Sequence, residues 1–443
     1  MKKINVPLFF LAIMPVSIIL GPSISLINTV LLSLIFFYEY FKTPRVKLYD
    51  KNVLIAFIIL YLYLIFNSFI SIDYTSGILR NVGFVRFILF FLTINFIFYK
   101  FSYDKRLFKI WTIVLLLVIF DIYIERLTGS NLLGYGKVQI DGVLQPHGLR
   151  VVSFFKTEPI AGAFSTGFVF IILGYIIDSF KKKKNFRILL LFFVLFSFIG
   201  ILITGERSNT LKVFFGIILF FLITDFLNWK IKISSLLLLL TLLVTTIYSS
   251  DYLKIRYFGQ FFDQIKTEEN RKNFVEKSLY FKLYKSGISV FKNHPFIGVG
   301  NKNYRIETCD EVKNIEHKNY HCLTHPHQIY IELLSEHGMF GTAIILSIIF
   351  YLLFRLLKQI IKSQNYLQIG AFIFIFLNFV PLLPSGSFFN DFNLTLFMIN
   401  FSLMYAVNKE TNIFSKRWDK YLVYIRAVSA IVEYCIYIPG VVG

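Results

Sequence analysis

The sequence has little charge for its length. Charged residues make up 16% of its 443 positions, whereas a soluble domain carries about 25%. This scarcity excludes an ordinary water-soluble enzyme. Acidic residues are the scarcer sign, with 26 Asp and Glu against 46 Lys and Arg, which gives a net charge of +20. That charge does not indicate nucleic-acid binding, because the basic residues gather in short stretches between apolar runs, as in cytoplasmic loops of membrane proteins.

Cysteine is also scarce, and no set of Cys, His and carboxylate residues has the spacing of a known zinc site. We therefore expect no metal and no cofactor. Cys309 and Cys322 lie in one long segment, whereas Cys435 lies near the C-terminus. An oxidising compartment would let the first two pair as a disulfide, and the alternative is two unrelated thiols. We expect the disulfide.

What the sequence has instead is apolar residues, at 56% of the chain, with 53 Phe and 26 Tyr. Apolar runs of about 18 residues recur, and each is long enough to cross a bilayer as a helix. The pattern predicts an all-α polytopic membrane protein. We expect twelve transmembrane helices, at 4–20, 24–41, 53–72, 82–99, 107–124, 160–177, 188–203, 211–227, 233–249, 339–357, 367–383 and 388–407.

The distribution of Lys and Arg predicts the orientation of these helices. If the N-terminus lies inside, the cytoplasmic segments hold 24 Lys and Arg, and the four short outer turns hold 2, Arg80 and Arg207. Short cytoplasmic loops are enriched in these residues. The first run lacks a cleavage site and reads as a retained helix.

Two outer segments, Glu125 to Glu158 and Ser250 to about Gly338, are too long to be turns. Long loops in a compact fold are usually functional. Within the second, Thr267–Phe291 suits amphipathic helices on the membrane surface. The expected units are spans one to nine (1–249), an outer loop with the active site (250–338), spans ten to twelve (339–407) and a cytoplasmic or interfacial tail (408–443).

Three arginines lie at the outer membrane edge, where charge is costly and therefore a candidate for function. Arg80 is expected in a turn and Arg86 within the fourth span, about 240° apart around a helix, so the two should not share a face. Arg86 faces either lipid or a polar cavity, and we favour the cavity. Arg207 lies in the turn Thr-Gly-Glu-Arg-Ser-Asn-Thr, where Ser208 or Asn209 could cap the next helix.

The position of Arg207 suits a phosphate clamp, because a guanidinium binds phosphate through two hydrogen bonds. The alternative is a solvated turn with an incidental Arg–Glu pair.

Histidine is concentrated in one stretch. His325, His327 and His337 fall within thirteen positions, and the chain has only seven His. Pro326 breaks any earlier helix, so His327 should open a helix that leads into span ten. The function that best explains these histidines is general-base catalysis, because the near-neutral pKa of an imidazole suits proton removal from a sugar hydroxyl. Zinc binding and a passive interfacial role are the alternatives.

The stretch HPHQIYIELLSEHGMFG resembles the His-x-x-Tyr…Glu-x-Gly-x-x-Gly signature of the bacterial O-antigen ligase and polymerase family. The motifs RNVGFVRFILF, RVVSFFKTEPIAGAF, TGERSNT, HPFIGVGN and PLLPSGSFFNDF follow the family's order, so the resemblance covers most of residues 70–395. Two positions depart from the family: Glu-Arg-Ser stands where Ser-Arg-Gly is usual, and Gln328 stands where Asn is commoner.

The resemblance implies an integral-membrane glycosyltransferase of lipopolysaccharide biosynthesis in the bacterial inner membrane, with its active site facing the periplasm. Such enzymes move a glycan from undecaprenyl diphosphate to an acceptor hydroxyl, without an essential metal. The partners implied are the lipid-linked donor, a lipid A–core or glycan acceptor, and membrane lipids.

The resemblance also implies residue roles. His327 would be the base, and Arg207 would hold the donor diphosphate. Arg80 and Arg86 would bind substrate, and we add His325 and Glu336 as binding residues.

Two other functions stay open. A polymerase of the same family would use another lipid-linked glycan as acceptor, and the longer second loop favours the ligase. A transporter of a lipid-linked glycan is disfavoured, because the sequence shows no paired internal repeats and its ionisable candidates crowd the outer edge.

Overall fold

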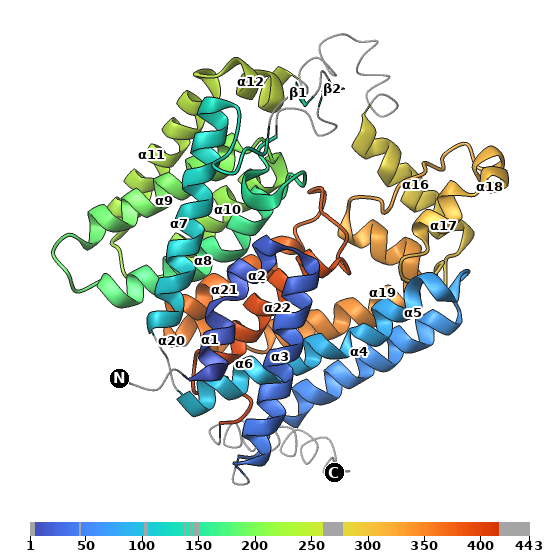
Figure 1. Ribbon diagram of the computed structural model, residues 1–443, viewed down its shortest axis with the longest axis horizontal. Coiled ribbons are helices and arrows are strands. Elements are labelled where there is room, and N and C mark those ends of the chain that lie inside the picture. The colour runs from blue at the N-terminus through green and yellow to red at the C-terminus, as the bar shows by residue number, and fades with distance from the viewer. Residues whose placement is uncertain are drawn as a thin grey trace, which may run out of the picture.

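The computed structural model describes residues 5–43, 46–101, 105–136, 139–140, 143–144, 150–259 and 278–415. In these ranges the chain is mostly helical, as predicted (Figure 1). The only sheet in them is a hairpin in which β1 (Gln139–Ile140) pairs antiparallel with β2 (Val143–Leu144), so that Gln139 lies opposite Leu144.

Helices occupy all twelve predicted spans. In chain order they are α1 (Val6–Ala12) and α2 (Met14–Leu20), α3 (Pro22–Phe41), α4 (Lys51–Phe69), α5 (Tyr74–Gly83) and α6 (Val85–Phe101), α7 (Lys105–Thr128), α8 (Ala161–Phe180), α9 (Phe186–Ile203), α10 (Arg207–Ile223), α11 (Trp229–Tyr248), α19 (Ile329–Phe354), α21 (Tyr366–Asn378) and α22 (Asp391–Ala406), with α20 (Leu357–Ser363) after α19. The first span is two short helices rather than one. Pro15 lies in the first turn of α2, where it cannot continue the hydrogen-bonding of α1.

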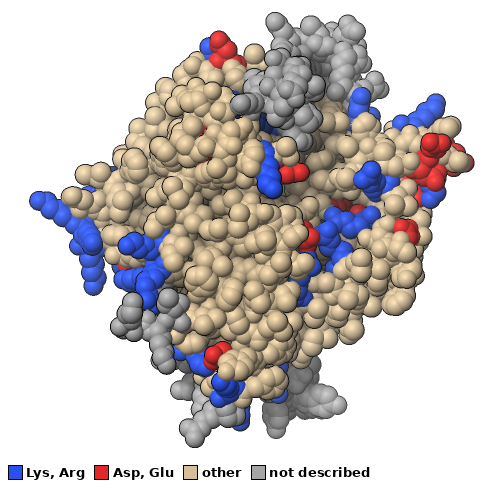
Figure 2. Space-filling model, in the orientation of Figure 1, with Lys and Arg blue, Asp and Glu red and all other residues tan. Residues whose placement is uncertain are grey.

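Eight helical segments of the described chain are long and apolar enough to cross a membrane: Pro22–Phe41, Lys51–Phe69, Tyr74–Phe101, Lys105–Thr128, Ala161–Phe180, Phe186–Ile203, Trp229–Tyr248 and Ile329–Ser363. The exact count of twelve crossings stays a prediction. The outer surface agrees with a lipid environment, because large apolar side chains such as Leu62 and Phe66 are exposed. Figure 2 shows uncharged residues over most of one face.

The core lies where α8, α21 and α22 pack together at the centre of the bundle (Figure 1). The backbones of α8 and α21 touch at two glycines. A Cβ at Gly174 would lie 2.3 Å from the Tyr366 carbonyl oxygen, and one at Gly370 would lie 2.1 Å from that of Phe170. Small residues let membrane helices approach this closely, so the two glycines set the spacing between α8 and α21.

The second long outer segment is folded rather than extended. It contains α12 (Asp251–Lys254), a π-helical turn at Ile255–Gly259, α16 (Leu279–Asn293), α17 (Tyr304–Cys309) and α18 (Glu311–Glu316). Cys309 and Cys322 form the predicted disulfide. In Figure 1, α16–α18 stand on the opposite side of the molecule from α11 and α12.

Residues 267–277 of the predicted surface stretch Thr267–Phe291 lie outside the described residues. The tail 421–443 also lies outside them. The described part belongs to α16, which packs against α19 at Gly287 and Ile331. Its contact with a membrane surface stays a prediction.

Candidate active site

The loop between α21 and α22 is the part of the chain that gathers the candidate residues. We refer to residues 381–390 as the linking segment. Its Ser385 amide donates a hydrogen bond of 2.9 Å to the carbonyl oxygen of His327. The hydroxyl of Ser208, the residue after Arg207, donates a hydrogen bond of 2.6 Å to the carbonyl oxygen of Pro384. The start of α10 and the start of α19 are therefore joined through two adjacent residues of this segment.

His327 lies in the short loop before α19, with a left-handed φ of 56°. The Gln328 side chain caps α19 by accepting a hydrogen bond of 2.9 Å from the Ile331 amide, so the prediction that a helix begins here is confirmed. The ring of His325 lies 4.0 Å from that of His327, centroid to centroid. Two imidazoles therefore share this site.

Burial lowers the pKa of His327, the positive charge of Arg150 adds to this, and a backbone hydrogen bond with Ser385 opposes it. For His325, burial and the nearby charges of His327 and Lys302 lower the pKa to about 3. Both rings are therefore neutral near pH 7. A neutral imidazole is able to accept a proton, as a general base requires.

Arg207 begins α10, but the capping predicted for this helix is wrong. The N-cap is Glu206, without a side-chain cap hydrogen bond. Ser208 bonds the linking segment instead, and the Asn209 amide donates to the Glu206 carboxylate at 2.7 Å. The amide of Gly162 donates to the same carboxylate at 2.6 Å. The side chains of Ser208 and Asn209 therefore form other hydrogen bonds and do not cap α10.

Burial raises the pKa of Glu206 to about 7, against the opposing effect of its hydrogen bonds from Gly162 and Asn209. The carboxyl group is therefore partly protonated near neutral pH. Glu206 therefore carries less than a full negative charge and neutralises the neighbouring Arg207 only in part. The Arg207 guanidinium thus stays able to bind an anion.

Two arginines that the sequence analysis missed lie beside Arg207. Arg207 interacts electrostatically with Arg150 and Arg256, and the charge of Arg150 also acts on His327. The ring of Tyr280 lies 6.3 Å from that of His327 and also interacts with Arg207. We call Arg150, Arg207 and Arg256 the arginine cluster. Its residues come from three outer segments, so only the fold brings them together.

Arg80 and Arg86 form a second cationic pair, and the prediction that they face apart is wrong. Both guanidinium groups contact the Asp391 carboxylate, Arg80 at 2.9 Å. Arg80 lies in the last turn of α5 rather than in a loop, and the helix is interrupted at Phe84 before Arg86 in α6. The predicted separation assumed one continuous helix. Arg80 also donates to the Phe389 carbonyl oxygen at 2.9 Å, which places the pair at the far end of the linking segment.

A buried carboxylate fixes the middle of the linking segment. Glu332 accepts hydrogen bonds from the Ser387 hydroxyl at 2.5 Å and the Phe388 amide at 3.1 Å. Lys302 donates to the same hydroxyl at 2.6 Å. Neither Glu332 nor Lys302 was predicted as a site residue, and both act here through the backbone that carries the site.

Glu336, predicted to bind substrate, is only 1% exposed. Its backbone carbonyl accepts a hydrogen bond of 2.8 Å from Gly300. The turn that contains Gly298 and Gly300 thus packs onto α19 just before its kink at Gly338, where φ is 63°. The binding role of Glu336 stays a prediction.

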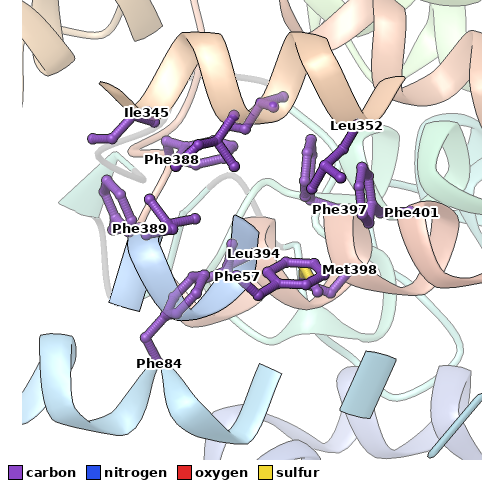
Figure 3. Close-up of a pocket in the computed structure, with 13 residues that line it drawn as sticks. Phe57, Phe84, Ile345, Leu352, Phe388, Phe389, Leu394, Phe397, Met398 and Phe401 are labelled. Atoms are coloured by element: carbon purple, nitrogen blue, oxygen red, sulfur yellow. The ribbon is translucent and has the colours of Figure 1, made fainter. Parts of the chain in front are cut away.

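An apolar cavity of about 20 Å³ lies on the membrane side of the linking segment (Figure 3). Its lining has no polar side chain and includes Phe388, Phe389, Phe57 and Phe401. The volume suffices for about one water molecule. The cavity is too small for a substrate.

Among the described residues no group of three His, Cys, Asp or Glu is arranged to hold a metal ion. A family model for O-antigen ligase matches residues 190–346. The matched stretch contains Arg207, His325, His327 and Glu336, whereas Arg80 and Arg86 lie outside it. No curated protein matches the chain.

Proposed function

We propose that this chain, whose residues 190–346 match a family model for O-antigen ligase, is a membrane glycosyltransferase that transfers a glycan from undecaprenyl diphosphate to an acceptor hydroxyl, such as one on lipid A–core. We place the reaction at the periplasmic face of the bacterial inner membrane. The observation that carries the proposal is the junction at Pro384 and Ser385. These residues join His327 to the residue that follows Arg207.

In the proposed reaction the acceptor oxygen attacks the sugar carbon that is bonded to the diphosphate. His327 accepts the proton of the acceptor hydroxyl as the new carbon–oxygen bond forms. The bond between the sugar carbon and the phosphate oxygen breaks, and undecaprenyl diphosphate leaves with the electron pair. Attack from the opposite side inverts the sugar carbon, so a product with retained configuration would rule this mechanism out. No step requires a metal.

The cations of the site support this assignment because negative charge develops on the leaving diphosphate. Arg150 acts electrostatically on both Arg207 and His327, so the arginine cluster brings positive charge close to the proposed base. Fixed donors aimed at developing charge typically contribute a factor of about 10²–10³ in rate. We assign Arg207 to the donor diphosphate, and Arg80 and Arg86 to phosphate groups at the other end of the linking segment.

The periplasmic placement rests on two features. The positive-inside distribution supports an outer position for Arg207. The disulfide between Cys309 and Cys322 fits an oxidising compartment.

The test is a gel of surface lipopolysaccharide from a strain that lacks the gene and carries wild type, His327→Ala or Arg207→Ala, with membrane protein levels matched. Wild type should restore the polymer ladder, and neither variant should. Polymer that accumulates on the carrier lipid indicates the ligase. Single repeat units on the core indicate the polymerase of the same family. A normal ladder from both variants would contradict the site.

A further inference from the structure

A second cavity, of about 100 Å³, lies under the linking segment between α10, α21 and α22. Unlike that of the apolar cavity, its lining includes polar side chains, among them Lys212, Asn378, Ser208 and Ser385. A volume of this size holds several water-sized groups, which is enough for a phosphate group. Gly386, also in the lining, is exposed at the surface of the protein.

Lys212 is a buried cation without a counter-charge. Its side chain belongs to a residue that is 7% exposed, and its ammonium donates one hydrogen bond, of 3.2 Å, to the amide oxygen of Asn378. No carboxylate of the described chain lies within ion-pair distance of it. An ammonium has three N–H donors, and a buried charge without a partner is costly. Lys212 is therefore an energetically costly buried charge at the wall of a cavity.

Other polar side chains of the cavity already donate hydrogen bonds to backbone carbonyl oxygens. Asn378 donates to the Phe374 carbonyl oxygen, Asn393 to that of Ser387, and Ser208 to that of Pro384. The Ser385 hydroxyl is buried and has no hydrogen-bond partner among the described residues. Among the lining side chains, Lys212 is the only cation, and Ser385 has the only hydroxyl group without a hydrogen-bond partner. Both donors suit an anion, and the Ser385 backbone is the group that holds His327.

The depth of Lys212 indicates which anion. Lys212 lies five residues after Arg207 in α10, which is about 7.5 Å deeper along the helix axis. Ser208 and Lys212 are four residues apart and share one face of the helix. A lipid diphosphate has one phosphate next to the glycan and one next to the membrane-embedded chain. A cation one and a half turns below Arg207 matches the phosphate nearer the lipid.

We propose that the cavity between Lys212 and Ser385 binds the lipid-proximal phosphate of the undecaprenyl diphosphate carrier. This inference rests on the proposed function and adds a binding site to it. When the phosphate is bound, it satisfies the Lys212 charge and the Ser385 hydroxyl together. Binding of the carrier thereby orders the residue that positions His327.

The test is binding of undecaprenyl diphosphate to the purified protein, followed by the rise in melting temperature with lipid concentration. Lys212→Met keeps the side-chain volume and removes the charge. We expect the apparent Kd to rise roughly tenfold or more, the scale of a charge-assisted hydrogen bond. Ser385→Ala should weaken binding to a smaller extent. Lys232→Met is the matched control, because Lys232 is also buried but donates to the Thr224 carbonyl oxygen at the other end of the bundle.

Stability of the lipid-free protein separates binding from a structural role. Removing a buried charge that has no counter-charge should leave the melting temperature of Lys212→Met at or above that of wild type. If Lys212→Met had a lower melting temperature or failed to fold, Lys212 would be needed for the packing of α10 on α21. That result would overturn the proposal.

Three further outcomes would also overturn it: unchanged binding in Lys212→Met, equal weakening in Lys232→Met, or an equal response of wild type to phosphatidylglycerol. An equal response to phosphatidylglycerol would mean that the cavity binds a phospholipid headgroup. The assay measures binding and not transfer, so an enzyme that binds the carrier but transfers nothing would contradict the proposed function alone.

Discussion

The backbone amide of Ser385 holds the carbonyl oxygen of His327 at 2.9 Å. His327 has a φ of 56°, a conformation that costs a residue with a side chain about 1–2 kcal/mol. A contact from another part of the chain offsets this cost and holds the backbone that carries the imidazole. The linking segment, although far from His327 in sequence, is therefore part of the active site.

Replacing His327 by Ala should lower the rate of glycan transfer by about 10²–10⁴, the usual contribution of a general base. The measurement is kcat of the purified enzyme with a lipid-linked donor. His321→Ala is the control, because His321 lies in the same loop and its side chain makes no hydrogen bond to the described residues, whereas its backbone amide donates to the Ser286 hydroxyl. Equal losses in both variants would point to a fault in loop folding and not to a missing base.

The pH profile should report the lowered pKa of His327. Burial favours the neutral ring, so the base stays available as the pH falls below 6.5, the ordinary value for His. Activity is then lost only when the pH falls through the lower pKa of the folded enzyme. kcat/KM measured between pH 4 and 8 should show its acid limb below pH 6.5. A limb above that value would mean that another group is the base.

Glu332→Gln tests the support of the linking segment. Glutamine has nearly the same volume but lacks the charge that accepts from Ser387 and Phe388. A hydrogen bond to a charged group contributes about 1.5–3 kcal/mol, and its loss should lower kcat roughly tenfold or more with a smaller change in KM. Glu316→Gln, in the outer loop, should have no effect on kcat. A variant whose kcat equals that of wild type would show that the segment holds His327 without Glu332.

Glu307 should stabilise the outer loop in a pH-dependent way. Burial raises its pKa, but hydrogen bonds from His294, Lys313 and Tyr320 outweigh this and lower the pKa to about 2. The stabilisation is present above the unfolded value of about 4.5 and is lost as the pH falls toward 2.

At pH 7 this stabilisation is on the order of 1–3 kcal/mol, the scale of a hydrogen bond to a charged group. Glu307→Gln should therefore lower the melting temperature at pH 7, and the difference from wild type should shrink on acidification. Glu311→Gln is the control. A difference that does not depend on pH would contradict the assignment.

The kink in α19 should tolerate only glycine. A Cβ at Gly338 would lie 2.4 Å from the Phe296 backbone, and the φ of 63° adds strain. Gly129→Ala separates the two effects, because Gly129 has a φ of 84° and no atom near its Cβ position. Gly338→Ala should reduce the yield of folded membrane protein much more than Gly129→Ala does. Similar yields would show that the loop before the kink moves aside.

The sequence predicted the parts of this fold that depend on local pattern. Apolar runs predicted a helix in each proposed span, and Pro326 with His327 predicted the start of α19. The Cys309–Cys322 disulfide followed from compartment and spacing.

What the sequence did not predict depends on contacts between distant segments. Arg80 and Arg86 meet because α5 and α6 are interrupted between them and Asp391 lies opposite. The capping role expected for Ser208 was lost to Pro384. Lys212 looked like one residue of an apolar span, since its cavity forms only when α10, α21 and α22 pack together.

The most direct test of the account is transfer by the purified enzyme in lipid nanodiscs, with an undecaprenyl-diphosphate-linked glycan as donor and lipid A–core as acceptor. Wild type should form the glycosylated acceptor, and His327→Ala and Arg207→Ala should lose transfer by a factor of at least about 10² while remaining folded. Transfer at the wild-type rate by either folded variant would contradict the account.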